Sequence, residues 1–65
     1  MVTDKMIARK LHLSRSEIYN IKSIYNNNMY EVSFDTDHLY YDVYIDATSE
    51  EIMGVNTIPV SSIRR

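Results

Sequence analysis

Two runs of alternating side chains, separated by a short polar turn, constrain the fold of this chain more than any other feature. Every second residue of each run is apolar: Tyr30, Val32 and Phe34 in the first, and Leu39, Tyr41, Val43 and Ile45 in the second. Successive side chains of a strand point to opposite faces of a sheet. Residues 29–35 and 39–46, joined by the turn at residues 35–38, therefore predict a β-hairpin with one apolar and one acidic face.

The N-terminal part of the chain predicts a helix, a single helical turn and another strand. Met6, Ile7 and Leu11 recur at helical spacing, which predicts a helix over residues 4–11. Ser14 and Glu17 form a Ser-x-x-Glu capping box, so a helical turn is expected there. A strand over residues 19–25 is predicted to follow, because β-branched isoleucines at positions 18, 21 and 24 favour a strand. The spacing of Ile18, Ile21 and Tyr25 also suits a longer helix.

After residue 46 the pattern is weaker. Residues 52–55 predict a further short strand, although a helical turn before Gly54 also fits. The segment 56–65 contains Pro59 and is predicted to be irregular or to form a sheet edge.

These elements predict one small α+β domain, in which an N-terminal helix packs on an antiparallel sheet of three to four strands. With 65 residues and no cysteine, the chain must take its stability from a small apolar core. The residues expected to be buried together are Ile7, Leu11, Ile21, Tyr30, Val32, Phe34, Tyr41, Val43 and Ile45.

The charges are segregated along the chain. Residues 1–25 carry five basic and two acidic side chains, whereas residues 26–63 carry seven acids and no Lys or Arg. Such segregation bears on the choice of partner and on the rate of association. The acidic part is expected to repel nucleic acid and to attract a basic protein surface.

The residue types argue against catalysis and metal binding. Asp35, Asp37, His38 and Asp42 lack the fixed offsets and terminal Glu of an EF-hand, and Gly54 is the only glycine, so no Gly-rich phosphate loop exists. A membrane span needs about 18 apolar residues, and no apolar run approaches that length. The charged N-terminus also lacks the apolar region of a signal peptide. We therefore expect a non-enzymatic binding protein, without cofactor or metal, in the cytoplasm.

Residues 30–55, YEVSFDTDHLYYDVYIDATSEEIMGV, resemble a PepSY domain. Ile45-Asp46-Ala47 and Glu51-Ile52 match the Ile-Asp-Ala-x-Thr-Gly-Glu-Ile signature of that family, and residues 8–22 resemble its helix and first strand. The resemblance implies a module that inhibits or modulates a partner, as in propeptides of secreted thermolysin-like peptidases and in cell-envelope proteins. Glu50 stands where the family usually has Gly, so a positive φ there would strain the turn.

Residues 7–21 also resemble a helix-turn-helix. Ala8 lies inside the first helix, Ser14 opens the second, and His12 replaces the usual Gly of the turn. This resemblance implies DNA binding through Arg15, Ser16 and Tyr19 and requires that residues 16–25 are mostly helical. The acidic hairpin would oppose DNA phosphates.

The acidic face of the hairpin is the candidate site for a protein partner. Its members are carboxylates, which would pair with Arg and Lys, and tyrosines, which bring large contact area: Glu31, Asp35, Asp37, Tyr40, Asp42, Tyr44 and Asp46. The partner is expected to be larger and basic, for example a peptidase or a nucleic-acid-handling effector. Small size and an acidic face are also typical of phage inhibitors such as anti-CRISPR proteins. A solvated face made acidic for solubility, or a structural module that oligomerises through its sheet edge, remain alternatives.

Overall fold

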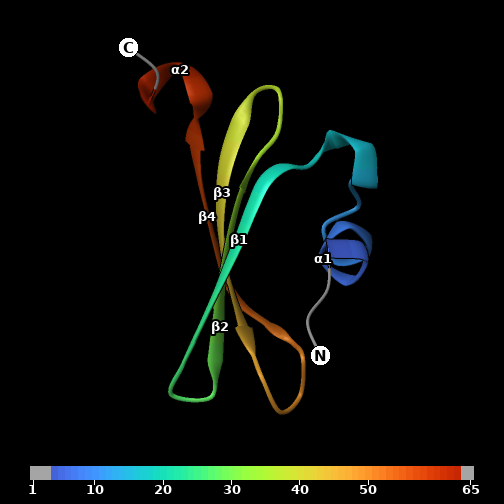
Figure 1. The fold of residues 1–65 in the computed structure, drawn as a ribbon, viewed down its shortest axis with the longest axis vertical. Helices are drawn as coiled ribbons and strands as arrows, with labels where there is room; N and C mark the ends of the chain where they lie inside the picture. The colour runs from blue at the N-terminus through green and yellow to red at the C-terminus, as the bar shows by residue number, and fades with distance from the viewer. Residues whose placement is uncertain (1–3, 64–65) are drawn as a thin grey trace.

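The computed structural model describes residues 4–63 as an antiparallel sheet with short helices at its ends and on one face (Figure 1). The elements in chain order are α1 (Asp4–Lys10), a 3-10 turn η1 (Arg15–Glu17), β1 (Tyr19–Asn26), β2 (Met29–Asp35), β3 (Leu39–Asp46), β4 (Ile52–Pro59) and α2 (Val60–Ile63). The four strands lie in the order β1-β2-β3-β4, so each pairs only with its neighbours in sequence. The predicted α+β class is confirmed.

The central hairpin has the bounds and the register that the alternation predicts. Val32 lies opposite Val43, and Phe34 lies opposite Tyr41, so the apolar positions of β2 and β3 share one face. The rings of Phe34 and Tyr41 stack with their centroids 4.8 Å apart. Thr36 closes the turn, because its N–H donates to the Leu39 carbonyl and its Oγ1 accepts from the Leu39 N–H.

A two-residue turn at Asn27 and Asn28 joins β1 to β2. Both residues have positive φ, 53° and 60°, as a type I′ turn requires, and Asn tolerates this conformation better than most residues. Asn26 pairs directly with Met29 on either side of the turn. Asn28 also ties the two turns at this end of the sheet together, since its Nδ2 donates to Oγ1 of Thr48 over 2.9 Å.

The segment between α1 and β1 is a strand with one preceding helical turn. The Ser14 N–H donates to Oε1 of Glu17 over 2.7 Å, which is the Glu17 half of the predicted capping box. Helical structure ends at Glu17, and β1 extends from Tyr19 to Asn26. A helix-turn-helix requires that residues 16–25 are mostly helical. That prediction is therefore wrong for this chain.

The C-terminal segment is more ordered than its sequence predicts. Residues 56–59 continue β4 at the sheet edge, so the edge alternative is confirmed for them and the irregular one is wrong. Residues 60–63 form the short α2, so an irregular tail is wrong there as well, and residues 64 and 65 lie outside the described part. Pro59 fits this strand because β4 is at the edge of the sheet. It lies opposite Leu39, at a position where the backbone nitrogen points away from β3, so the missing N–H costs no hydrogen bond between the strands. The Val60 N–H then donates to the His38 carbonyl and closes the ladder.

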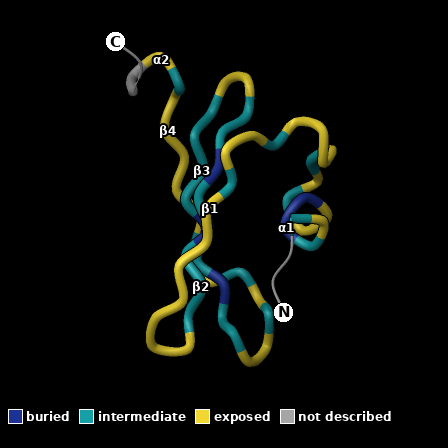
Figure 2. Tube along the Cα trace, viewed as in Figure 1, coloured by how far each residue is buried: buried dark blue, intermediate teal, exposed yellow. Residues whose placement is uncertain are grey.

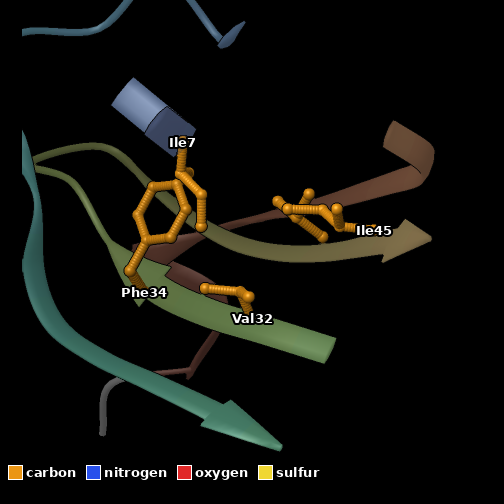
Figure 3. Close-up of a cluster of buried hydrophobic side chains, with 5 residues drawn as sticks. Ile7, Val32, Phe34 and Ile45 are labelled. Carbon is orange, nitrogen blue, oxygen red and sulfur yellow. The ribbon is translucent and has the colours of Figure 1, made fainter. Parts of the chain in front are cut away.

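The core lies between α1 and the apolar face of β2 and β3. Ile7 points from α1 toward Phe34 and Val32 of β2 and Ile45 of β3 (Figure 3). These side chains and Val43 are at most 1% exposed, and Ala8 is also buried. Four other residues of the predicted core are only half-buried and pack around these: Leu11, Ile21, Tyr30 and Tyr41. Much of β1 and β4 is exposed (Figure 2).

The helix α1 ends in a Schellman motif, in which His12 occupies the position that usually holds glycine. The Leu13 N–H donates to the Ala8 carbonyl over 2.8 Å, and the His12 N–H donates to the Arg9 carbonyl over 3.2 Å. This geometry gives His12 a φ of 60°, where glycine is the usual residue. Glu50 likewise has a φ of 63°, so the β3–β4 turn has the positive φ at which a side chain is strained.

We predict that His12→Gly stabilises the protein. Removing the Cβ relieves the strain of a side chain at positive φ, and this relief exceeds the extra conformational entropy that glycine loses on folding. The free energy of unfolding should rise by up to about 1 kcal/mol. For a domain of this size, a gain of about 1 kcal/mol raises the melting temperature by about 4–8 °C. His12→Ala, measured beside it by thermal unfolding, keeps the Cβ and should give no such rise. Equal melting temperatures for the two variants would contradict the strain argument.

Candidate functional site

The sheet face turned away from α1, here called the open face, gathers the predicted acids and tyrosines. In each cross-strand pair of β2 and β3 on this face the two side chains are neighbours. Glu31 lies opposite Tyr44, Asp35 opposite Tyr40, Ser33 opposite Asp42, and Met29 opposite Asp46. Six of the seven predicted site residues therefore lie on the open face: Glu31, Asp35, Tyr40, Asp42, Tyr44 and Asp46.

Asp37 is the exception. It lies in the turn between β2 and β3, exposed at the end of the sheet and close to His38 and Val60. The structure therefore places Asp37 apart from the open face.

The centre of the open face is a hydroxyl shared by two carboxylates. The Tyr44 hydroxyl donates toward Oε2 of Glu31 over 3.2 Å and toward Oδ2 of Asp42 over 3.4 Å. The negative charges of Asp42 and Glu31 raise the pKa of Tyr44, because a phenolate beside them would be repelled. Tyr44 thus remains a hydrogen-bond donor at neutral pH and links β2 to β3 across the face.

One carboxylate oxygen at this centre has no hydrogen-bond donor. Oδ1 of Asp42 is excluded from solvent and lacks a partner among the described residues. An unsatisfied buried acceptor costs about 1–3 kcal/mol, and such groups in folded proteins call for a specific explanation. A buried acceptor without a donor therefore lies at the centre of the open face.

Asp46, at one end of the open face, serves the β3–β4 turn. Its Oδ2 accepts from the Ser49 N–H over 2.7 Å, from Oγ of Ser49 over 3.0 Å, and from the Thr48 N–H over 3.1 Å. The hydrogen bonds from Ser49 and then Thr48 lower the pKa of Asp46, despite partial burial. This carboxylate therefore acts first as a turn-stabilising group.

We predict that Asp46 makes stability depend on pH in the acid range. Because its pKa is lower in the folded state, its contribution is present above the unfolded pKa, about 3.9, and is lost as the pH falls through the folded value. Asp46→Asn should lower the melting temperature at pH 7, and the difference from the wild type should shrink at pH 3. Asp37→Asn, in the other turn, is the matched control and should track the wild type at both pH values. An Asp46→Asn deficit that persists undiminished at pH 3 would contradict this role.

At the other end, the open face is hollowed. The hollow has a volume of about 310 Å³ and is lined by Asn20, Lys22, Ser33, Asp35 and Tyr40. Nδ2 of Asn20 donates to Oδ2 of Asp35 over 3.1 Å. The wall of this hollow is thus polar and contains one cation and one carboxylate.

Sequence reasoning missed the contributions of β1 and β4 to the open face. From β1 come Lys22, opposite Ser33, and Ile24, opposite Glu31. From β4 come Asn56, opposite Asp42, and Ile58, opposite Tyr40. Ile24 is 63% exposed and Ile58 is 44% exposed, so an apolar side chain flanks the acidic centre on each edge. Only the register of the outer strands, fixed by the Asn27-Asn28 turn and the β4 bulge, identifies these residues.

Within residues 4–63, no group of three or more His, Asp or Glu side chains is arranged to hold a metal ion. In the same part of the chain, no helix is both long and apolar enough to cross a bilayer. Compared with family models, with curated proteins and with solved structures, the chain has no significant match. The resemblance to PepSY domains therefore stays a prediction.

Proposed function

We propose that this protein binds a larger protein with a basic surface through the open face of its sheet, and thereby inhibits that protein. The observation that carries the proposal is the array on β2 and β3, where four carboxylates and two tyrosines share one face that α1 leaves uncovered. Among the described residues of that face, Lys22 is the one basic side chain. The face therefore has a net negative charge.

The charge distribution supports an oriented encounter. The other described basic side chains lie on α1, which packs on the opposite side of the sheet, and on η1, which contacts α1: Lys5, Arg9, Lys10 and Arg15. A molecule with opposite charges on two sides turns its acidic side toward a basic partner as it approaches, which raises the association rate.

The chemistry at the centre of the face favours Arg as the contacting group. A guanidinium offers several donors in a planar fork and pairs with carboxylates through two hydrogen bonds. Glu31 and Asp42 flank the Tyr44 hydroxyl, and Oδ1 of Asp42 lacks a donor. A guanidinium that replaced the Tyr44 hydroxyl would supply both carboxylates, and the tyrosine ring would remain as a stacking surface.

Two further considerations support inhibition. The PepSY resemblance implies a module that restrains a partner. Acidic and aromatic groups arranged along strands also resemble the charge track of nucleic acid, so the basic groove of a nucleic-acid-handling effector fits as the target. A phage inhibitor of the anti-CRISPR type would act in this way.

The experiment uses an arginine nonapeptide as the probe. Titrated into the ¹⁵N-labelled protein at 50 mM and 300 mM NaCl, the peptide should shift amide signals of β2 and β3, and the higher salt should weaken binding. The double reversal Glu31→Lys with Asp35→Lys should weaken binding at least tenfold. These two positions are chosen over Asp46, whose carboxylate the β3–β4 turn requires.

The matched control is Asp37→Lys with Glu51→Lys, which changes the net charge equally at two exposed positions in the turns. Binding by this control should stay within about threefold of the wild type, since exposed charges at a distance are screened by salt. Equal losses in both double variants would show attraction by net charge alone and would contradict a specific face. Shifts confined to α1 would contradict the proposal as well.

A further inference from the structure

The outer edge of β4 differs from every other strand of the sheet in its composition. β4 contains no charged residue, whereas β1 carries Lys22, and β2 and β3 carry acids. Three of its apolar side chains are well exposed: Met53 at 59%, Val55 at 41% and Ile58 at 44%. Sheet edges in monomeric proteins are commonly protected by charges, bulges or proline. On β4 such protection is found only at the two ends.

The ladder between β3 and β4 determines which backbone groups face outward. The Val60 N–H donates to the His38 carbonyl, so residue 60 points its hydrogen-bonding groups toward β3. In an antiparallel pair these groups alternate in direction. Gly54, Asn56 and Ile58 therefore bond to β3, and the N–H and C=O groups of Val55 and Thr57 point away from the sheet.

The free part of this edge is short and has clear limits. On one side the register shift between Tyr44 and Ile45 places a bulge at the start of β4. On the other side stands Pro59, which has no N–H to donate. Between them lie residues 54–58, and Asn56 is their midpoint.

We propose that two copies of this chain pair antiparallel through residues 54–58 of β4, around a two-fold axis at Asn56. Val55 of each copy then lies opposite Thr57 of the other, and their outward N–H and C=O groups form four main-chain hydrogen bonds. The result is one eight-stranded sheet with both open faces on the same side. An uncharged strand favours its own copy, because no like charges meet across the axis.

The single glycine of the chain fits this register. Gly54 has an ordinary negative φ, and a Cβ built on it would meet only the Tyr44 ring, at 4.0 Å. The fold of one copy therefore has room for a side chain there, and a strand glycine often marks the close approach of another group. In the proposed pairing, the exposed Ile58 of one copy lies directly opposite Gly54 of the other, so the isoleucine can cover the space that glycine leaves.

The other sheet edge is less suited to such pairing. β1 has a register shift between Tyr19 and Lys22, with Asn20 at a φ of 56°. A second copy paired through the regular residues 22–26 of this edge would place Lys22 opposite Asn26 of the other copy, so a charged side chain would lie in the interface. The regular part of this edge is therefore no longer than that of β4, and it is charged.

The test is amide hydrogen exchange of the full chain as a function of concentration, combined with sedimentation equilibrium. Because five residues per chain make a small interface, we expect dissociation constants on the order of 10–100 μM. The amides of Val55 and Thr57 should exchange fast in dilute samples and become protected in concentrated ones. Those of Asn56 and Ile58 should be protected in both, since they bond to β3. A monomer at all concentrations up to 1 mM, or a dimer that leaves Val55 and Thr57 unprotected, would overturn the pairing.

Two substitutions separate the dimer from the fold of one copy. Thr57→Pro removes an outward N–H that β3 does not use and should abolish the dimer. If that variant does not fold, Ile58→Lys gives a second test and should weaken the dimer at least tenfold, whereas Ile24→Lys, the same change on β1, should not. Equal dimerisation by Ile58→Lys and Ile24→Lys would contradict the register. Failure here leaves the binding of a basic partner untouched, since that test uses variants of β2 and β3.

Discussion

Phe34→Ala should remove a large part of the free energy of unfolding of this protein. Phe34 is fully buried and stacks on Tyr41 at the centre of the hairpin. Truncation of a buried Phe to Ala costs about 3–5 kcal/mol, from lost burial and from the cavity that remains. Domains of this length have a total stability of about 3–10 kcal/mol, so the change removes much of it. Urea unfolding followed by circular dichroism would measure the loss.

The control for this prediction is an apolar residue of the same sheet that lies in solvent. Ile24 is 63% exposed, and Ile24→Ala should change the free energy of unfolding by less than about 0.5 kcal/mol. A Phe34→Ala variant as stable as the wild type would mean that β2 and β3 are paired one residue out of register.

Ile7→Ala should release α1 from the sheet. Ile7 is 1% exposed and contributes the helix side chain that meets Phe34 and Ile45 in the core (Figure 3). α1 has only seven residues, and isolated helices shorter than about 12–15 residues are marginal in water. The loss of about 2–5 kcal/mol expected for a buried Ile→Ala change therefore also removes the support that keeps α1 helical. Cα chemical shifts of residues 4–10 should move toward random-coil values.

A graded series makes this prediction sharper. Ile7→Val removes one methyl group and should cost about 0.5–1.5 kcal/mol while α1 stays helical. Lys5→Ala, on the exposed side of the same helix, should leave both stability and chemical shifts near the wild type. Helical shifts that survive Ile7→Ala without loss of stability would show that α1 is held by other contacts.

The strands that sequence predicted best are those whose two faces meet different environments. In β2 and β3, Val32 and Val43 face the core while Glu31 and Asp42 face the open side, so burial imposes a period of two on the sequence. β4 lacks this contrast after Val55, because its residues are exposed on both faces. Its extension to Pro59 follows from pairing with β3, which local sequence does not reveal.

The candidate site shows the same division. Alternation alone brought Glu31, Asp35, Tyr40 and Tyr44 to one face. It could not show that the Asp46 carboxylate bonds to Ser49 and Thr48, because hydrogen bonds from backbone and side chain within a turn depend on its local geometry. Asp37 was included with the site for its charge alone, although a turn residue at the end of a hairpin belongs to neither face.

The order of the strands has a consequence for how the molecule folds. Because the spatial order β1-β2-β3-β4 is also the chain order, every strand meets its partner across a short turn, and only small loops must close. Low sequence separation between contacting residues is associated with fast folding, and single hairpins form in about 1–10 μs. The central hairpin of β2 and β3 can thus form first and be extended by one strand on each side. α1 can dock last, when the apolar surface that it covers is complete.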